Sequence, residues 1–496
     1  MRVLLETRAA LDGGHAGIPQ AARLLFHALA GLDGVEVEGL IQSSNKVLAR
    51  GLPDERHGAR RAMSEDRRID LLARLVVSLQ QHHPGSWLAR TGSGLERVLA
   101  PGMMMLRALL GRREPLTRFE ADRFRDFVWR AFFAKTLPTE DFDTVTNVAF
   151  RVARVPWSAM HAGGLLTRKF GRAVYPRLDT TGFDVLLAET PYPGRVSGNT
   201  KLVVRYHDAF PLLMPHTITD RVYHQASHYH SLLANVRDGA WFVCVSEATR
   251  RDLLTLFPQA EARAVTIPNM VSHHYFPEDS SPRRIGEIMR VREHGWIQQL
   301  PKPEVQAIRR SRLGRQYLLM VSTIEPRKNH LTLLAAWEQL RAHHFPTLEL
   351  VTVGMLGWDH ESIIHKYRPW LRSGIVHMLE DVPAPELRLL FKHARATVCP
   401  SFGEGFDYSG VEAMRCGGVV VASDIPVHRD IYRDAAEYFN AYSTTGLVQA
   451  VKRVIDADAV PRRNELIEAG QAVSADFNTQ VVLPQWRDFL LRLSSS

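Results

Sequence analysis

The feature that most restricts the fold of this 496-residue chain is an alternation of short apolar runs with helical segments, which occurs twice. The first series of apolar runs covers 2–7, 183–189, 201–208, 240–247 and 264–269, and the second covers 315–323, 347–354, 374–379, 394–401 and 418–423. Buried parallel strands have this continuous apolar, β-branched character. Strands that alternate with helices indicate a parallel sheet covered on both faces. The sequence therefore predicts an α/β protein with two doubly wound, Rossmann-like domains.

The predicted domain boundaries follow from the positions of the two series. We expect an N-terminal domain over 1–277 with a helical, arginine-rich insertion at about 42–180, and a polar linker over 278–314. A C-terminal domain should cover 315–470, and the last segment, 471–496, should form a helix that packs back toward the N-terminal domain. In doubly wound sheets, ligands bind at the carboxyl ends of the strands. The predicted ligand site is therefore the cleft between the two domains.

One part of the insertion, 97–135, combines nine basic and four acidic residues with interleaved phenylalanines and a tryptophan. A basic amphipathic helix of this type can lie on an anionic membrane. The alternative is an insertion that packs its apolar face on the domain and leaves its arginines in water, which is the commoner use of such a face. The packed alternative is slightly favoured.

Charge and cysteine content narrow the compartment and the partners. The net charge of +9 favours anionic partners such as nucleotides, phosphorylated lipids, an acidic membrane surface or nucleic acid, and charge alone does not rank them. Three cysteines cannot form a disulfide framework, the first residues resemble a strand and not a signal peptide, and no run of eighteen apolar residues is present. A cytoplasmic protein is expected, without nucleic acid as a partner.

Metal-binding patterns are weak. His224 and His228 have an i, i+4 spacing but lack the acidic residue of H-E-x-x-H, and the triplets at 141–143 and 456–458 are short acidic runs of a common kind. The sequence contains no zinc spacing, no G-x-S-x-G and no Walker motif. We expect no metal site.

Three loops at predicted strand ends carry polar groups that should meet in the cleft. "GGHAGIPQ" (13–20) places glycines before a helix N-terminus, where backbone amides can approach a phosphate. His207 and Asp208 directly follow a strand, and a histidine there can bind a substrate hydroxyl or carry a proton. Arg327 and Lys328 lie between a strand and a helix, an arrangement that suits a diphosphate.

The stretch "CPSFGEGFDYSGVEAM" (399–414) contains two carboxylates, Glu404 and Glu412, with glycines between them. In one interpretation, Ser409 and Glu412 form a capping box in which Glu412 reaches back to the first amide of the helix. In the other, both acids face a ligand at the mouth of the loop. The local pattern alone leaves both open.

Taken together, "STIEPRKNH" and "PSFGEGFDYSGVEAMRCGGVVVASDIPVHRDI" resemble the retaining GT-B glycosyltransferases of family 4, also called glycosyl transferases group 1. The resemblance covers the C-terminal domain fully and the N-terminal domain more thinly, and excludes 42–180. It implies that Glu404 faces the donor sugar and that Glu412 binds the ribose hydroxyls. It also implies that Arg327 and Lys328 neutralise the leaving diphosphate, and that His207 contacts the sugar.

The resemblance assigns two further groups to the donor. The glycines of the first loop that match the family are Gly13, Gly14 and Gly17, which would close on the diphosphate or the acceptor. The backbone of the turn after Glu404 would hold the donor sugar; its residues are Gly405, Phe406, Asp407, Tyr408 and Ser409. Family members often have "EGFGLP" where this chain has "EGFDYSG", so the identity of the sugar is open.

The resemblance implies a retaining transfer of a sugar from a nucleoside diphosphate donor, with GDP-mannose or a rhamnose donor as the hypothesis. The acceptor would be a glycan of a bacterial O-antigen, capsule or exopolysaccharide, carried on a polyprenyl diphosphate at the inner face of the plasma membrane. No cofactor or metal is expected, because two cations take the role of a divalent ion. The alternatives are another GT-B enzyme, such as a sugar-nucleotide epimerase or a phosphorylase, and an inactive partner subunit.

Overall fold

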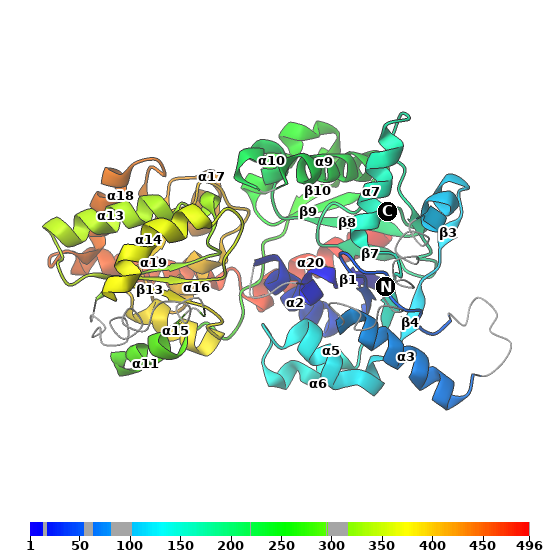
Figure 1. The fold of residues 1–496 in the computed structure, drawn as a ribbon, viewed down its shortest axis with the longest axis horizontal. Coiled ribbons are helices and arrows are strands. Elements are labelled where there is room, and N and C mark those ends of the chain that lie inside the picture. Colours follow the sequence, from blue (N-terminus) through cyan, green and yellow to red (C-terminus); the bar gives the residue numbers. More distant parts are fainter. Residues whose placement is uncertain are drawn as a thin grey trace.

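The computed structural model describes residues 1–12, 17–53, 63–80, 102–218, 220–293, 295 and 316–495. The chain forms two lobes, each built on its own β-sheet (Figure 1). The loop residues 13–16, which include Gly13 and Gly14, lie outside the described residues, as do 81–101 of the arginine-rich segment and 296–315 of the polar linker.

The first lobe contains an eight-stranded sheet in the order β10-β9-β8-β7-β1-β2-β5-β4. Adjacent strands are parallel except for β4, which pairs antiparallel with β5 at one edge. The strands are β1 (Arg2–Glu6), β2 (Glu36–Ile41), β4 (Thr117–Phe119), β5 (Phe150–Val152), β7 (Val185–Ala188), β8 (Lys201–Tyr206), β9 (Trp241–Cys244) and β10 (Ala264–Thr266). A short pair, β3 (Arg113–Glu114) and β6 (Arg177–Leu178), lies apart from this sheet.

The second lobe contains a six-stranded, all-parallel sheet in the order β13-β12-β11-β14-β15-β16. The residues of β11 and β12 pair one to one, with Leu319 opposite Val351. The strands are β11 (Tyr317–Val321), β12 (Glu349–Val353), β13 (Val376–Leu379), β14 (Ala396–Cys399), β15 (Val420–Ser423) and β16 (Ala436–Phe439). The α/β class with two parallel sheets, predicted from the alternation of apolar runs, is confirmed.

Helices connect the strands and cover the sheets. In the first lobe they are α1 (Arg8–Asp12), α2 (Gly17–Ala30), α3 (Glu65–Gln80), α5 (Arg125–Val128), α6 (Phe142–Thr146), α7 (Trp157–Arg168), α8 (Phe210–Leu213), α9 (Arg221–Arg237) and α10 (Glu247–Leu256). In the second lobe they are α11 (Ile285–Val291), α13 (His330–His343), α14 (Glu361–Ser373), α15 (Ala384–His393), α16 (Tyr408–Arg415), α17 (Pro426–Tyr432), α18 (Thr444–Ile455) and α19 (Val460–Ala475).

Each sheet is buried on both faces, since successive side chains of a strand point to opposite sides. In β1, Leu5 packs in one apolar cluster and Leu4 in another, on the opposite face of the sheet. In β11, Leu319 and Leu318 likewise pack in two different clusters. This two-sided burial explains why the strands are apolar throughout and do not alternate with polar residues.

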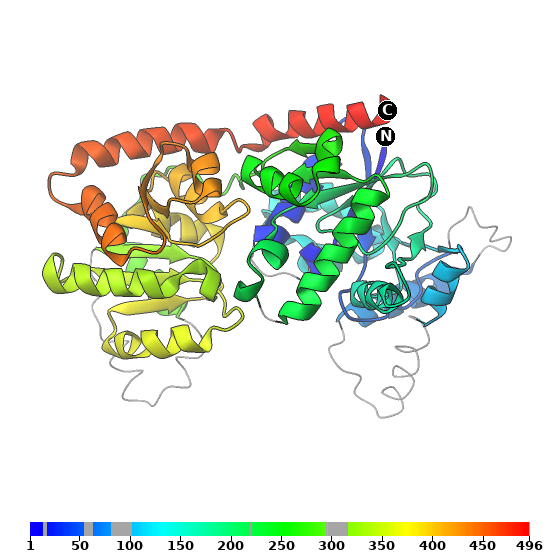
Figure 2. The ribbon, with the colours of Figure 1, turned by 90° about the horizontal axis from the view of Figure 1, so that it is seen from above.

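The last helix, α20 (Thr479–Ser495), belongs to the core of the first lobe although α19 before it packs on the second. Trp486 and Phe489 of α20 lie in the same apolar cluster as Leu5. In Figure 2 these final helices, drawn in red, run along one side of the molecule from one lobe to the other. The chain thus crosses between the lobes twice, and the two crossings are joined where the Val271 amide donates to the Phe477 carbonyl at 2.9 Å.

The arginine-rich insertion is not simply helical. Residues 102–109 form a helix, but the chain then contributes β4 and β5 to the edge of the first sheet. The short helices α5 and α6 lie between β4 and β5 in the sequence. The expected amphipathic helix over 97–135 is therefore wrong for the described part. Phe119, Phe132 and Phe133 are each 1% exposed and pack in the core, as the packed alternative requires.

The polar stretch 278–314 is more than a linker. Its helix α11 packs Ile285 and Ile288 into the apolar cluster of the second lobe. Glu278 accepts a hydrogen bond from Arg388 at 2.6 Å, which ties the start of the stretch to α15. The described part of this stretch is thus an element of the second lobe.

Candidate active site

A cavity of about 580 Å³ lies between the two lobes and is lined by residues from both. The described members of the predicted site all line it: Gly17, His207, Arg327, Lys328, Glu404, Gly405, Phe406, Asp407, Tyr408, Ser409 and Glu412. They come from segments up to about four hundred positions apart, which the two sheets bring together at the carboxyl ends of their strands. This is where doubly wound folds bind ligands.

At the cavity, the loop that contains Gly405 in the second lobe passes close to the loop that contains His207 in the first lobe. A Cβ atom on Gly405 would lie 1.9 Å from the carbonyl oxygen of His207, so only glycine fits at this position. The Gly405 carbonyl accepts hydrogen bonds from the hydroxyls of Ser246 (2.8 Å) and Thr249 (3.2 Å) at the start of α10. The turn that follows Glu404 is therefore fixed against the first lobe.

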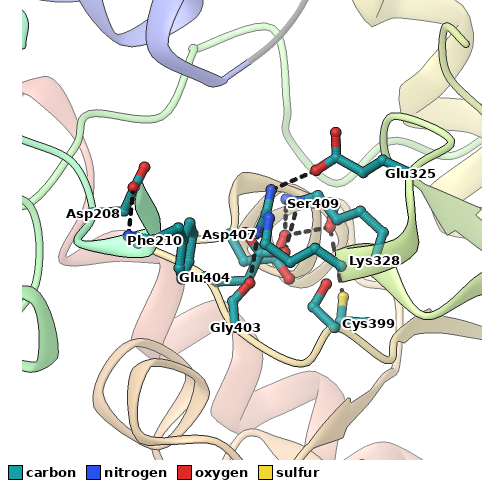
Figure 3. Close-up of polar contacts among 12 residues, drawn as sticks. Asp208, Phe210, Glu325, Lys328, Cys399, Gly403, Glu404, Asp407 and Ser409 are labelled. Carbon is teal, nitrogen blue, oxygen red and sulfur yellow. Dashed lines mark hydrogen bonds and ion pairs between the residues drawn. The ribbon is translucent and has the colours of Figure 1, made fainter. Parts of the chain in front are cut away.

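Glu404 is held by the two cations that the sequence singled out. Its carboxylate accepts from Arg327 Nη1 at 3.0 Å and from Lys328 Nζ at 2.6 Å (Figure 3). Arg327 also donates to Glu325 at 2.8 Å, and its guanidinium lies over the Phe210 ring at 4.6 Å. Two cations and two carboxylates thus form a nearly neutral, buried cluster. The sequence predicted the cations but not their neutralisation by Glu325 and Glu404.

The charges of this cluster stabilise one another. Burial raises the pKa of the Glu404 carboxyl, but Lys328 and Arg327 outweigh it and hold that pKa below its usual range. Burial likewise lowers the pKa of Arg327, but Glu404 and Glu325 reverse the sign and raise it. Glu404 and Arg327 are therefore both charged at neutral pH, which gives the cavity a fixed pair of opposite charges.

The helix that follows the turn begins at Tyr408, with Asp407 as its N-cap. Asp407 has φ of 59°, a left-handed conformation that glycine usually takes and that aspartate tolerates. Its carboxylate accepts from the Ser409 amide at 3.3 Å and the Ser409 hydroxyl at 2.6 Å. The other carboxylate oxygen pairs with His428 at 3.1 Å. Ser409 is therefore not the cap, and the capping-box interpretation of Ser409 and Glu412 is wrong.

Glu412 consequently lies inside the helix and points at the first lobe. Its Oε1 accepts a hydrogen bond from Gln20 Nε2 of α2 at 2.7 Å, across the cavity. It also shares a hydrogen bond with the Tyr275 hydroxyl. Burial raises the pKa of the Glu412 carboxyl to about 8. Of the two interpretations of the acidic pair, the one in which Glu412 faces the cavity fits this placement, while its binding of ribose stays a prediction.

The two families whose sequence patterns match this chain cover both lobes. Glycosyl transferases group 1 matches residues 301–473, and Glycosyltransferase Family 4 matches residues 125–275. The chain belongs to glycosyltransferase family 4. The recognition of this family from the paired acids and "STIEPRKNH" is confirmed.

Curated relatives of this family 4 chain are mannosyltransferases, according to their names. O-antigen chain mannosyltransferase B of Escherichia coli is 28% identical over 236 residues, covering 47% of this chain and 56% of the relative. Serotype-specific mannosyltransferase WbdA of Escherichia coli is 27% identical over 290 residues, covering 56% of this chain and 33% of the relative. The matched segments thus span about half or less of the length of these relatives.

Solved structures give the fold of the family 4 chain. Sucrose-phosphate synthase from Thermosynechococcus elongatus aligns with a TM-score of 0.54 and 16% identity, over 100% of this chain and 99% of the other. HepE from Anabaena, solved with UDP and glucose, aligns with a TM-score of 0.51 and 16% identity, over 75% of this chain and 94% of the other. The predicted GT-B fold is confirmed.

Several residues that line the cavity or contact its lining were not singled out from the sequence. Gln20 and Tyr275 reach Glu412, Glu325 holds Arg327, and Glu189 accepts from His207 Nε2 at 3.1 Å. Glu189 is fully buried, and its pKa is lowered because Arg205 and His207 outweigh the effect of burial. Glu189 ends the predicted strand 183–189 and Gln20 ends the predicted loop 13–20, and these positions were signals that could have found them; Tyr275 carried none.

His224 and His228, which were considered for a metal, both lie on α9. Among the described residues, no group of three or more histidine, cysteine, aspartate or glutamate side chains is arranged to hold a metal ion. His228 instead lies 3.4 Å from the Tyr206 hydroxyl. Within the described ranges, every helix is too short or too polar to cross a bilayer.

Proposed function

We propose that this protein transfers a sugar from a nucleoside diphosphate donor to a glycan acceptor, with retention of configuration as the family resemblance implies. The observation that carries the proposal is the gathering of Arg327, Lys328, Glu404, Glu412 and His207 around one interdomain cavity. Two carboxylates, two cations and a histidine from separate loops form a site suited to a substrate with a diphosphate and a sugar at opposite ends.

The charge pattern suits glycosyl transfer. When the bond between the anomeric carbon and the phosphate oxygen breaks, its electron pair stays with the diphosphate and positive charge develops on the sugar ring. Preorganised cations stabilise the first charge and a nearby carboxylate the second. Glu404 contacts both cations, so it lies at the boundary between the diphosphate and the sugar in the proposed complex.

Lys328 has donors to spare for the leaving group. An ammonium has three protons; one goes to Glu404, and within the described part of the chain no second side-chain acceptor is bonded to Lys328. Arg327, by contrast, is engaged by Glu325, Glu404 and the Gly403 carbonyl. We assign Lys328 the direct contact with the diphosphate and Arg327 the task of fixing Glu404. With these cations in place, the proposed reaction needs no divalent ion.

For the donor sugar, we propose mannose, because both curated relatives are named as mannosyltransferases, one of them for an O-antigen chain. The departure from "EGFGLP" is compatible with a tight turn, since Asp407 adopts a left-handed conformation that glycine usually takes and caps the helix with its own side chain. As acceptor we propose a bacterial surface glycan, such as an O-antigen unit, on a polyprenyl diphosphate carrier.

A carrier of this kind would place the acceptor at a membrane, and we propose peripheral contact with an anionic bilayer. The helix at 102–109 exposes apolar side chains toward solvent, with Leu106 50% and Leu109 64% exposed, beside Arg107. It lies against α7, where Met105 meets Gly163, and the chain just beyond α7 exposes Phe170 to 89%. Apolar side chains among basic ones suit an anionic lipid surface.

The experiment that tests the function is transfer from labelled GDP-mannose, UDP-glucose and dTDP-rhamnose to a polyprenyl-diphosphate oligosaccharide. GDP-mannose should be used, and Glu404→Gln should abolish transfer. Glu349→Gln is the matched control, because Glu349 is also a buried carboxylate of the second lobe, paired with His377 at 3.1 Å, outside the cavity. Nucleotide binding without transfer would indicate an inactive partner subunit, and no nucleotide binding would contradict the proposal.

A further inference from the structure

Tyr442 is an aromatic side chain that the fold holds in place and yet leaves in solvent. It lies between β16 and α18 and is 81% exposed. Its ring stacks on the ring of Phe402, with centroids 5.0 Å apart and the two planes 29° from parallel. A tyrosine ring that is already ordered in this way offers a flat apolar face to a ligand at little cost in conformational entropy.

The two rings are fixed to the loops that carry the proposed catalytic residues. The Phe402 amide donates a hydrogen bond to the Arg327 carbonyl at 3.0 Å. The buried side chain of Asn329 donates to the carbonyls of Pro400 at 3.0 Å and Ala441 at 2.9 Å, which joins the two loops that carry the rings. The stacked pair therefore keeps a set position relative to the cation pair of the site.

The stacked pair lies at the edge of the cavity, beside the boundary between the lobes. Phe402 is two residues before Glu404, so their Cα atoms are at most about 7 Å apart. Between them, a Cβ on Gly403 would lie 2.8 Å from Met214 Sδ and 2.9 Å from the Phe210 ring of the first lobe (Figure 3). Phe210 and Glu404 both line the cavity. An acceptor that extends out of the cavity on this side passes the two rings.

Asn440 adds an oriented amide beside the exposed ring. Its Oδ1 accepts from the Tyr442 backbone amide at 2.9 Å, and the residue is exposed. Within the described part of the chain, no acceptor is bonded to Asn440 Nδ2, so its two protons are available to a ligand. A sugar unit presents C–H groups that suit the electron-rich face of an aromatic ring, and hydroxyls that suit the amide. A lipid chain would use only the ring.

We propose that Phe402, Tyr442 and Asn440 form a binding platform for the glycan acceptor, which holds a sugar unit beyond the one that receives the new sugar. This inference rests on the proposed function. The Tyr442 ring stacks on the C–H face of that unit and the Asn440 amide donates to one of its hydroxyls. Because the platform lies outside the cavity, an acceptor of one sugar does not reach it from the reaction centre. The platform therefore makes the protein prefer acceptors of several sugars.

The test compares Tyr442→Ala and Tyr442→Phe with a matched control, Tyr229→Ala. Tyr229 is also an exposed tyrosine, at 37%, and its ring lies 6.1 Å from the Phe257 ring, but it is on α9 and does not line the cavity. The donor is GDP-mannose, and the acceptors are polyprenyl diphosphates that carry either one mannose or four. The measured quantity is the ratio of kcat/KM for the long acceptor to kcat/KM for the short one.

The wild type should prefer the long acceptor through a lower acceptor KM at similar kcat. Tyr442→Ala should reduce this preference by ~3–10-fold, as expected for the loss of an aromatic stacking partner. Tyr442→Phe should keep it, because the phenyl ring preserves the stacking face, and so should Tyr229→Ala. Tyr442→Ala should also bind GDP and melt like the wild type, since an exposed ring is removed and no buried cavity is created.

Three results would overturn the inference. No preference in the wild type, or an equal preference in Tyr442→Ala, would show that the ring does not contact the acceptor. An equal fall for both acceptors would place the effect at the reacting end. A wild-type dimer that Tyr442→Ala converts to a monomer in sedimentation would assign the rings to a second copy of this chain.

The proposed function fails separately, if the wild type uses neither acceptor and binds no GDP. Saturation-transfer NMR with free mannotetraose then still tests the platform. Wild-type protein should bind this tetrasaccharide and Tyr442→Ala should bind it more weakly; equal signals, or no signal from the wild type, would overturn the inference.

Discussion

Replacing Glu412 by glutamine should make the protein more stable at neutral pH, although it removes a charged residue type from the proposed active site. Glu412 is 4% exposed, and burial raises the pKa of its carboxyl from 4.5 to about 8. Glutamine has nearly the same shape and stays neutral, so it reproduces the protonated form that the folded protein prefers.

The size of the effect follows from the two pKa values. Below pH 4.5 the carboxyl is protonated in both the folded and the unfolded chain, and its contribution to stability is fully present. Between pH 4.5 and about 8 the unfolded chain loses the proton while the folded protein retains it, so stability falls as pH rises. At pH 7 the loss amounts to about 3 kcal/mol, taking 1.36 kcal/mol for each pH unit above 4.5. Glu412→Gln should recover up to that amount.

The assay is urea-induced unfolding of wild type and Glu412→Gln between pH 5 and 9. The difference in unfolding free energy should be small at pH 5, grow through pH 7 and level off above pH 8. Glu404→Gln is the control with the opposite sign, because Lys328 and Arg327 hold the pKa of Glu404 below its usual range. Loss of the Glu404 carboxylate in this variant should destabilise the protein by about 3–5 kcal/mol, as breaking a buried ion pair does. A pH-independent difference for Glu412→Gln would refute the burial argument.

The same carboxyl provides a test of ribose binding. If Glu412 binds ribose hydroxyls as a carboxylate, nucleotide binding at pH 7 must release about one proton, because the empty site holds the protonated form. Calorimetry in two buffers of different ionisation enthalpy measures this release. Glu412→Gln should bind the nucleotide more weakly and release no proton, since a neutral hydrogen bond replaces a charge-assisted one. Equal affinity and equal proton release would remove Glu412 from the nucleotide site.

Three further outcomes are expected. Lys328→Ala should reduce turnover at saturating donor by ~10²–10³, as expected when one donor to a transition-state anion is lost, and near wild-type turnover would contradict its assignment to the diphosphate. Transfer should persist in EDTA, and complete loss that Mg²⁺ or Mn²⁺ restores would show that the reaction uses a divalent ion. The protein should float with anionic but not neutral vesicles at low salt, because each basic residue near the surface contributes about 1 kcal/mol to binding. Leu109→Glu and Phe170→Glu should each weaken flotation. Flotation that neither variant affects would contradict the proposed membrane surface.

The sequence revealed the strands that contain an unbroken apolar run and missed β2, in which charged residues interrupt that run. β11 and β14 are continuous apolar runs and were predicted within a few residues. β2 was not, because its Glu36 and Glu38 indicate an exposed segment. In the structure Glu38 is 4% exposed and is paired with Arg2 at 2.5 Å and Arg151 at 2.6 Å, on the two strands that flank β2. Such a strand is recognisable only when its neighbours are known.

The capping interpretation failed for a local reason that the sequence could not resolve. Both Asp407 and Ser409 are good N-cap residues, and only Ser409 has a glutamate three positions later. The decision fell to the backbone, which turns left-handed at Asp407 because Gly405 must pass close to His207 and because His428 holds the other carboxylate oxygen. The helix then begins two residues before the position that a capping box at Ser409 requires.

The sequence by itself determined the set of helices and strands and the chemical groups at their ends. Apolar runs predict parallel strands, and the polar residues directly after these strands must lie at one edge of the sheet. What only the tertiary structure decided was how those groups pair. Lys328 and Glu404 are 76 positions apart and Gln20 and Glu412 are 392 apart, yet each pair is joined by a hydrogen bond. The physical reason is that charge and protonation depend on distance in space. The ion pairs around Glu404 exist only once loops of the second lobe have come together, and the raised pKa of Glu412 exists only once burial in the fold has excluded water.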